Sequence, residues 1–200
     1  MNPLMTIKGT LAVGFILAIA MAFGLGNGFN GMSAVIWLHV LAGVVWIGLL
    51  YYFNFVQVPG VGKAVAEAND GGPGPAAINK YVAPPALLWF RMAAAVTWLT
   101  GVSGLAQLGG GAQGIIDAFM LSGNMAVIGM GAWLGTIMLF NVWVLIWPNQ
   151  KKILGLDGKE HSAEDIASAK KVALLASRTN TALSIPMLYC MVGYAHGFAF

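Results

Sequence analysis

Long apolar stretches separated by polar segments constrain this chain more than any other feature. A helix needs roughly 20 residues to cross about 30 Å of hydrocarbon, and five stretches are long enough. Hydrophobic residues make up 58% of the 200 residues and charged residues only 8%, whereas soluble domains carry about 25% charged residues. A water-soluble globule of this length could not bury so much apolar surface, so the bilayer must act as solvent.

The predicted fold class is therefore an all-α integral membrane bundle of about five transmembrane helices. The whole chain, residues 1–200, is expected to form a single helical domain. The predicted spans are approximately 8–27, 32–56, 85–108, 123–147 and 174–198.

The distribution of lysine and arginine predicts how the bundle is oriented. Segments 1–8, 57–84 and 148–173, with the adjoining ends of the third and fifth spans, hold all ten basic residues. The loops at 27–31 and 109–122 hold none. Basic residues of short loops stay in the cytoplasm, so we expect the N-terminus inside and the C-terminus outside a bacterial cytoplasmic (inner) membrane. This topology also explains the net charge of +3, so no nucleic-acid partner is predicted.

The connecting segments differ in character. Residues 57–84 surround a Gly-Gly-Pro-Gly-Pro run and predict a polar loop with a flexible centre. Apolar residues recur at helical spacing within 109–122, which favours a short helix lying in the interface. Pro148 is expected to end the fourth helix. Ser162 followed by Asp165 favours a helix start that continues into the fifth span.

His39 is the strongest candidate for a cofactor ligand. It shares one stripe of the second span with Gly43 and Trp46, and an imidazole inside a membrane helix is costly unless it is paired or ligating. One interpretation is haem b, with His39 bound to the iron, Gly43 admitting the ring edge and Trp46 beside it. The other is a neutral His39 that hydrogen-bonds a neighbouring helix. His196 is a candidate second ligand, or an exposed residue at the end of the fifth span.

Polar residues near the inner ends of the last three spans form a second candidate site. Asn180 and Ser184 share a face, and Asn141 on the fourth span could supply a hydrogen-bonding partner. The structural interpretation is an interhelical hydrogen-bond cluster. The functional one is a polar pocket whose basic rim attracts an anionic ligand. The pocket residues are Arg91, Asn141, Asn149, Gln150, Arg178 and Asn180.

Several kinds of chemistry find no support in the sequence. Cys190 is the only cysteine, which excludes an intramolecular disulfide and a CxxCH site for covalent haem. Neither a P-loop, a nucleophile elbow nor a zinc-binding spacing occurs. We assign no catalytic residues.

Several short motifs resemble the membrane domain of bacterial PuuD-type urate oxidases. They are Trp37-Leu38-His39 with Ala42-Gly43 and Trp46-Ile47-Gly48, Lys80-Tyr81 with Pro84-Pro85, Gly135-Thr136-Ile137-Met138 with Asn141-Val142, Pro148-Asn149-Gln150-Lys151, and Asn180 with Pro186. The similarity spans about residues 35 to 190. The leucine–histidine helix is also similar, more loosely, to those of the HemJ and CopD membrane families.

This resemblance implies a membrane redox context. HemJ-type proteins bind haem b through a histidine on such a helix, and PuuD-type enzymes join the membrane part to a cytochrome c domain. The chain departs from the urate oxidase pattern at Gly129, where that family leads us to expect a histidine. The leading hypothesis is a membrane subunit of a bacterial redox system that binds haem b on His39. It would anchor or relay electrons for a partner dehydrogenase or periplasmic cytochrome c. The alternative is a non-catalytic accessory or scaffold subunit of a larger membrane complex.

Overall fold

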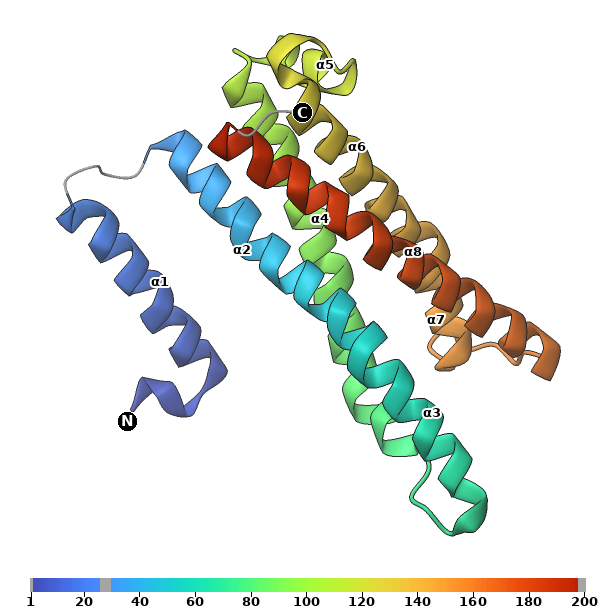
Figure 1. Cartoon of the computed structure of the whole chain (residues 1–200). Helices are drawn as coiled ribbons and strands as arrows, with labels where there is room; N and C mark the ends of the chain where they lie inside the picture. Colours follow the sequence, from blue (N-terminus) through green and yellow to red (C-terminus); the bar gives the residue numbers. More distant parts are fainter. Residues whose placement is uncertain (1, 26–29, 198–200) are drawn as a thin grey trace.

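The structure is a computed structural model that describes residues 2–25 and 30–197. All regular elements within these ranges are helical, which confirms the all-α fold class (Figure 1). The α-helices are α1 Ile7–Gly24, α2 Gly31–Tyr52, α3 Val58–Glu67, α4 Ala83–Leu108, α5 Ala112–Phe119, α6 Ala126–Phe140, α7 Trp147–Ile153 and α8 Ala163–His196. Short 3-10 turns occupy Pro3–Met5, Ala68–Asp70 and Gly123–Met125. The ends of the first and last predicted spans, at 26–27 and 198, lie outside the described residues.

Four described helical stretches are long and apolar enough to cross a membrane, and they indicate a lipid bilayer environment. These stretches are Ile7–Gly24, Gly31–Asp70, Ile78–Leu108 and Gly123–Ile153. They contain the described parts of the first four predicted spans except Leu25. The fifth predicted span lies in α8, whose 34 residues reach about 50 Å at 1.5 Å per residue. This helix is not among the four stretches. It carries several polar residues in its second half, among them Asn180 and Ser184, which are fully buried in the bundle, and its first half carries Glu164, Asp165, Lys170, Lys171 and Arg178.

The bundle is assembled from two closely packed helix pairs. α2 packs along α4, and α6 packs antiparallel to α8, while contacts between the two pairs are fewer. The main core lies where the pairs meet, around Trp46, Leu50, Phe90, Met138 and Val142. Two tight pairs with looser contacts between them leave room for an internal cavity.

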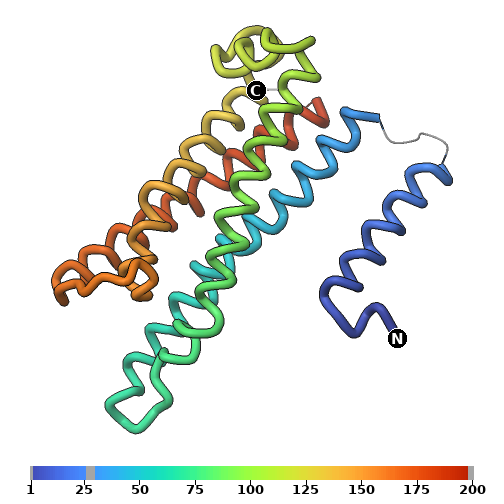
Figure 2. The backbone as a smooth tube through the Cα atoms, turned by 180° about the vertical axis from the view of Figure 1, so that it is seen from behind, coloured from blue at the N-terminus to red at the C-terminus, as the bar shows by residue number. Residues whose placement is uncertain are grey.

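The first helix lies beside this bundle. None of the residues of α1 is buried, and α1 stands apart from the other helices in both views (Figures 1 and 2). Phe15 packs edge-on against Trp37 of α2, with ring centroids 5.4 Å apart. An apolar helix with both faces open is stable in lipid but not in water.

Three π-helical turns interrupt the long helices. They are η2 Phe53–Gln57, η4 Ile78–Val82 and η6 Asn141–Ile146. Each leads directly into an α-helix whose second residue is proline, namely Pro59, Pro84 or Pro148. Proline lacks an N–H group and its ring clashes with the carbonyl one turn back, and a wider turn relieves this clash. The prediction that Pro148 ends the fourth helix is therefore wrong, because the helix continues through η6 into α7.

The segment 57–84 also differs from the sequence prediction. It forms a helical hairpin and not a polar loop: α3 continues from α2 through η2, and the returning chain enters α4 through η4. The turn between them uses Gly71 and Gly74, which adopt φ of +83° and +64°, a region that favours glycine. The predicted helix in 109–122 is confirmed as α5, and the predicted start at Ser162 is confirmed by its hydroxyl, which accepts from the Asp165 N–H at 3.0 Å.

The two ends of the bundle differ in basic residues, because α5 and the C-terminal end of α8 carry no lysine or arginine. α5 and the C-terminal end of α8 lie at one end of the bundle, and α3, α7 and the start of α8 lie toward the other (Figure 1). Lysines 63, 151, 152, 170 and 171 belong to this second group of helices. The fold thus gathers basic residues far apart in sequence on one side, as the positive-inside rule requires.

Candidate functional site

A cavity of about 480 Å³ lies between the two helix pairs. This volume falls within the roughly 300–1,000 Å³ typical of sites for small molecules and cofactors. All four long helices of the bundle and α5 contribute to its mainly apolar wall. Its lining includes His39 and Trp46 from α2, Thr97, Trp98 and Gly101 from α4, Phe119 from α5, Gly131 and Gly135 from α6, and Met187, Met191 and Tyr194 from α8.

His39 is oriented by a hydrogen bond to the neighbouring helix. Its Nδ1 lies 2.8 Å from the carbonyl oxygen of Thr97. A carbonyl can only accept, so Nδ1 carries the hydrogen and donates it. The neutral ring then keeps its lone pair on Nε2, the arrangement found in metal-ligating histidines whose other nitrogen donates to a backbone carbonyl. The interhelical hydrogen bond predicted for His39 is present, and it leaves Nε2 available as an acceptor or ligand.

Gly101 allows the imidazole to lie close to α4. A Cβ atom at this position would lie 3.0 Å from Cε1 and 3.3 Å from Nδ1 of His39, which is closer than van der Waals contact allows without displacement. Gly104, one turn further along α4 on the same cavity wall, would place a Cβ 3.9 Å from Val35, an ordinary contact. The two glycines therefore differ in what they do for His39.

The other predicted cofactor residues separate into two groups. Trp46 lines the cavity and is only 2% exposed, and its buried indole N–H has no acceptor among the described residues. Gly43 does not line the cavity; a Cβ there would lie 3.8 Å from the Thr97 methyl group. His196 is the last residue of α8, is exposed, and hydrogen-bonds through Nδ1 to the Val192 carbonyl at 3.0 Å. The structure thus places His39 and Trp46 on one cavity and leaves His196 off its wall.

Asn141 and Asn180 form the interhelical contact expected from the sequence. Asn141 Nδ2 donates to Asn180 Oδ1 at 2.8 Å, and Asn180 Nδ2 donates to the Met138 carbonyl at 2.9 Å. Both amides are buried. Their hydrogen-bonding capacity is directed toward each other and toward α6, so they join α6 to α8.

The remaining residues of the predicted polar pocket lie in other surroundings. The Arg91 guanidinium stacks on Trp147, 3.8 Å from the ring centroid, which joins α4 to α7 by a cation–π contact. Asn149 Nδ2 donates to the Leu145 carbonyl at 2.7 Å, Gln150 is half-buried and Arg178 is exposed. None of the six described pocket residues lines the cavity that holds His39.

Sequence reasoning missed the contacts between α2 and α8. Tyr51 Oη lies 2.9 Å from Ser184 Oγ, and Asn54 Nδ2 donates to Ser177 Oγ at 2.8 Å. Trp98, also missed, joins α4 to α6 by donating to Thr136 Oγ1 at 2.9 Å. Asn54 carried the clearest signal, since an amide within an apolar span needs a partner.

Gly129 stands where the resemblance to urate oxidases leads us to expect a histidine. A Cβ atom there would overlap the backbone carbonyl of Ala118 on α5. The position therefore excludes any side chain, and α5 occupies the space into which a histidine would project.

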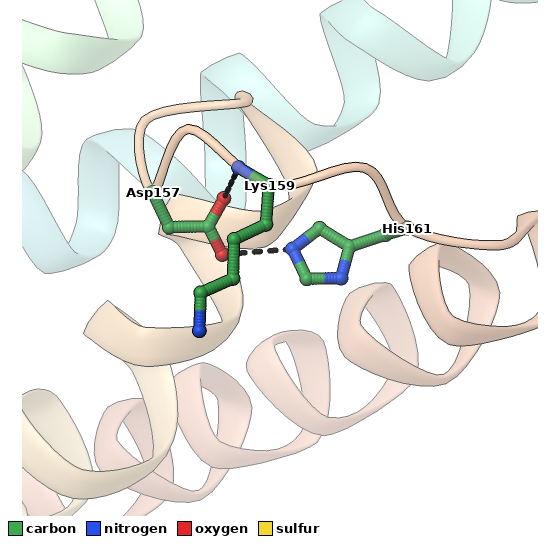
Figure 3. Close-up of polar contacts among 3 residues, drawn as sticks. All are labelled: Asp157, Lys159 and His161. Carbon is green, nitrogen blue, oxygen red and sulfur yellow. Dashed lines mark hydrogen bonds and ion pairs between the residues drawn. The ribbon is translucent and has the colours of Figure 1, made fainter.

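The loop between α7 and α8 is organised by one carboxylate. Asp157 Oδ2 lies 2.8 Å from His161 Nε2, and Asp157 Oδ1 accepts from the backbone N–H of Lys159 at 3.3 Å (Figure 3). These hydrogen bonds, that from His161 above all, hold the pKa of the Asp157 carboxyl below its ordinary value. This loop lies at the same end of the bundle as α3, away from α5 (Figure 1).

Fold and site together define an α-helical membrane protein with a cofactor-sized cavity and one inward-facing histidine. Residues 111–200 match the family model described as urate oxidase N-terminal. The resemblance to the membrane domain of urate oxidases is thus confirmed over this part of the chain, which includes α5 to α8. The similarity to the HemJ and CopD families stays a prediction. Neither the curated proteins nor the solved structures contain a match to the chain.

Proposed function

We propose that this chain is a membrane subunit of a redox system related to the urate oxidase membrane domain, and that its cavity binds haem b through His39. The observation that carries the proposal is the hydrogen bond from His39 Nδ1 to the Thr97 carbonyl. It fixes the tautomer in which Nε2 can bind iron, on the wall of an internal cavity.

The wall of the cavity suits a haem group. Its side chains are mostly apolar and include aromatic rings from four helices, namely Trp46, Trp98, Phe119 and Tyr194. The buried indole N–H of Trp46 has no acceptor among the described residues, and a carboxylate or carbonyl oxygen of a bound group would supply one. An unpaired buried donor costs about 1–3 kcal/mol, so a ligand that accepts from it gains affinity.

Bound haem supplies reversible one-electron chemistry at iron. The chain's own residues have simpler tasks. His39 is positioned by Thr97, Gly101 admits the imidazole against α4, and the apolar side chains of the wall exclude water. A dry surrounding and the strength of the His39 hydrogen bond are the means by which the protein would tune the iron potential.

The family match and the bundle topology favour association of this chain with other redox proteins at the membrane. We propose that the chain lies in the bacterial cytoplasmic membrane with its N-terminus inside and α8 as its fifth span. The end of the bundle that carries α5 would then face the periplasm, as a separate periplasmic cytochrome c requires for electron transfer. Urate is the substrate class that the family name favours for the complex as a whole.

Spectra of histidine variants test the haem site. The protein purified from haem-replete cells should show a Soret band, and His39→Gly should lose at least roughly tenfold in bound haem. Added imidazole should restore it, because the missing ring leaves a matching space. His196→Ala and His161→Ala are the controls, since neither residue lines the cavity. A wild-type protein without a Soret band would contradict the proposal, and so would undiminished haem in His39→Gly.

One observation favours the alternative of a scaffold subunit. α1 has no buried residue and exposes its apolar side chains on all sides, so it offers a surface on which a helix of another subunit could pack. A scaffold should migrate with other subunits on a native gel and lose them when α1 is removed. A stable haem-binding monomer in detergent would contradict this alternative.

A further inference from the structure

We propose that Met191 on α8 is the second axial ligand of the iron, opposite His39; this inference rests on the proposed haem site. The cavity separates the α2–α4 pair from the α6–α8 pair. His39 belongs to the first pair, so a ligand on the other side of a flat group must come from the second pair.

Few side chains on that second wall can bind iron. Of its residues, Tyr194 donates its hydroxyl to the sulfur of Met125, 3.6 Å away, and the glycines and alanines have no donor atom. The thioethers of Met187 and Met191 remain. Methionine is an established partner of histidine on haem iron.

The register of α2 against α8 distinguishes the two methionines. Tyr51 meets Ser184 and Asn54 meets Ser177, and the two helices run antiparallel. His39 lies about twelve residues before Tyr51, so at equal rise per residue it is level with the last two turns of α8. Met191 lies in those turns, whereas Met187 lies about one turn deeper.

The backbone of α6 supports the Met191 side chain. A Cβ atom on Gly131 would lie 3.0 Å from Cε and 3.5 Å from Sδ of Met191, so the thioether rests directly on the bare backbone of that helix. Both residues line the cavity. A supported sulfur loses less freedom on binding iron than a mobile one would.

Absorption and magnetic circular dichroism spectra of the haem-loaded protein test this assignment. The wild-type protein should be six-coordinate and low-spin, with the near-infrared charge-transfer band of a thioether ligand. Met191→Leu keeps the volume nearly constant and should give five-coordinate, high-spin iron with a lower reduction potential while haem stays bound. Met187→Leu is the matched control and should keep the wild-type spectrum.

The outcomes separate this inference from the haem proposal. Absence of any Soret band in the wild-type protein would contradict the haem site itself. A Soret band that His39→Gly abolishes, with a Met191→Leu spectrum and potential equal to wild type, would overturn Met191 alone. The wild-type charge-transfer band decides the matter without any substitution should Met191→Leu fail to accumulate, because its absence also overturns the assignment.

Discussion

At the scale of single residues, the role of a buried polar side chain depends on whether it has a hydrogen-bond partner within the protein. His39 donates to Thr97 and keeps Nε2 for a ligand, while Asn141 and Asn180 bond each other. The indole N–H of Trp46 is left without an acceptor among the described residues. Buried donors are paired in most proteins, and this unpaired donor belongs to a residue that lines the cavity. The side-chain oxygens of Asn54 and Gln57 are also buried without a partner among the described residues, but neither residue lines the cavity.

Adding a methyl group at Gly101 should disturb His39. The new Cβ would lie 3.0 Å from the imidazole, so the ring must shift and the hydrogen bond to Thr97 weakens. Alanine at either Gly101 or Gly104 gains up to about 1 kcal/mol of helix propensity. In Gly101→Ala the contact with His39 should cancel this gain in helix propensity, so this variant should be about 1 kcal/mol less stable than Gly104→Ala. Thermal unfolding in detergent measures the difference, and equal stabilities would contradict the close contact.

The Asp157 carboxyl should titrate at a higher pH when His161 is removed. Its pKa in the folded protein is held below the ordinary value of 3.8. The hydrogen bond between His161 and Asp157 therefore stabilises the loop above pH 3.8, and this stabilisation is lost as the pH falls through the lower pKa of the folded protein. His161→Ala should raise the pKa of the Asp157 carboxyl back toward 3.8, which carbon NMR of Asp157 measures. Lys159→Ala is the control, because its contact comes from the backbone.

At the scale of elements, two of the three π-turns are preceded by the same kind of hydrogen bond, from an asparagine side chain to a backbone carbonyl. The carbonyls of Leu50 and Met138 each lie three residues before a π-turn begins, and each accepts a hydrogen bond from an asparagine amide, of Asn54 and Asn180 respectively. Each carbonyl also accepts from the backbone N–H three residues later, so the asparagine side chain adds a second hydrogen bond where the pattern changes from α to π. The following proline is then accommodated without ending the helix.

The Asn141–Asn180 pair should therefore couple α6 to α8 energetically. Asn141→Ala and Asn180→Ala should each destabilise the bundle, and the double variant should lose less than their sum. We expect a coupling of about 0.5–1.5 kcal/mol, the range for hydrogen bonds between membrane helices. Unfolding in mixed micelles gives the four stabilities. Thr179→Ala, at an exposed neighbouring position, should change little, and a purely additive double variant would contradict the coupling.

At the scale of the whole molecule, a cavity lies between two tight helix pairs, and most of the lysines lie toward one end of the bundle. The helices carrying most of the lysines extend from one end, while α5 and the end of α8 lie at the other. Under the positive-inside rule, this distribution of lysines predicts that the end carrying α5 faces outward.

Cysteine labelling tests this orientation. The single native cysteine, Cys190, is buried, so wild-type cells should react little with an impermeant maleimide. Gln113→Cys on α5 should be labelled from outside intact cells. Lys159→Cys in the loop before α8 should be labelled only after the membrane is opened. The reverse pattern would overturn the predicted topology.

The sequence by itself determined the helical fold class, the first four apolar spans, the small helix α5, the capped start of α8 and the resemblance to the urate oxidase membrane domain. Hydropathy, capping residues and charge act within one segment, so they can be read along the chain. Only the tertiary structure decided that Pro148 and Pro59 lie within continuous helices, that Asn54 and Tyr51 join α8, and that His39 lines one cavity with Met191 and Trp46 but not with His196. These facts depend on how helices distant in sequence turn their faces toward one another, and packing between helices, not the pattern of any one of them, fixes that rotation.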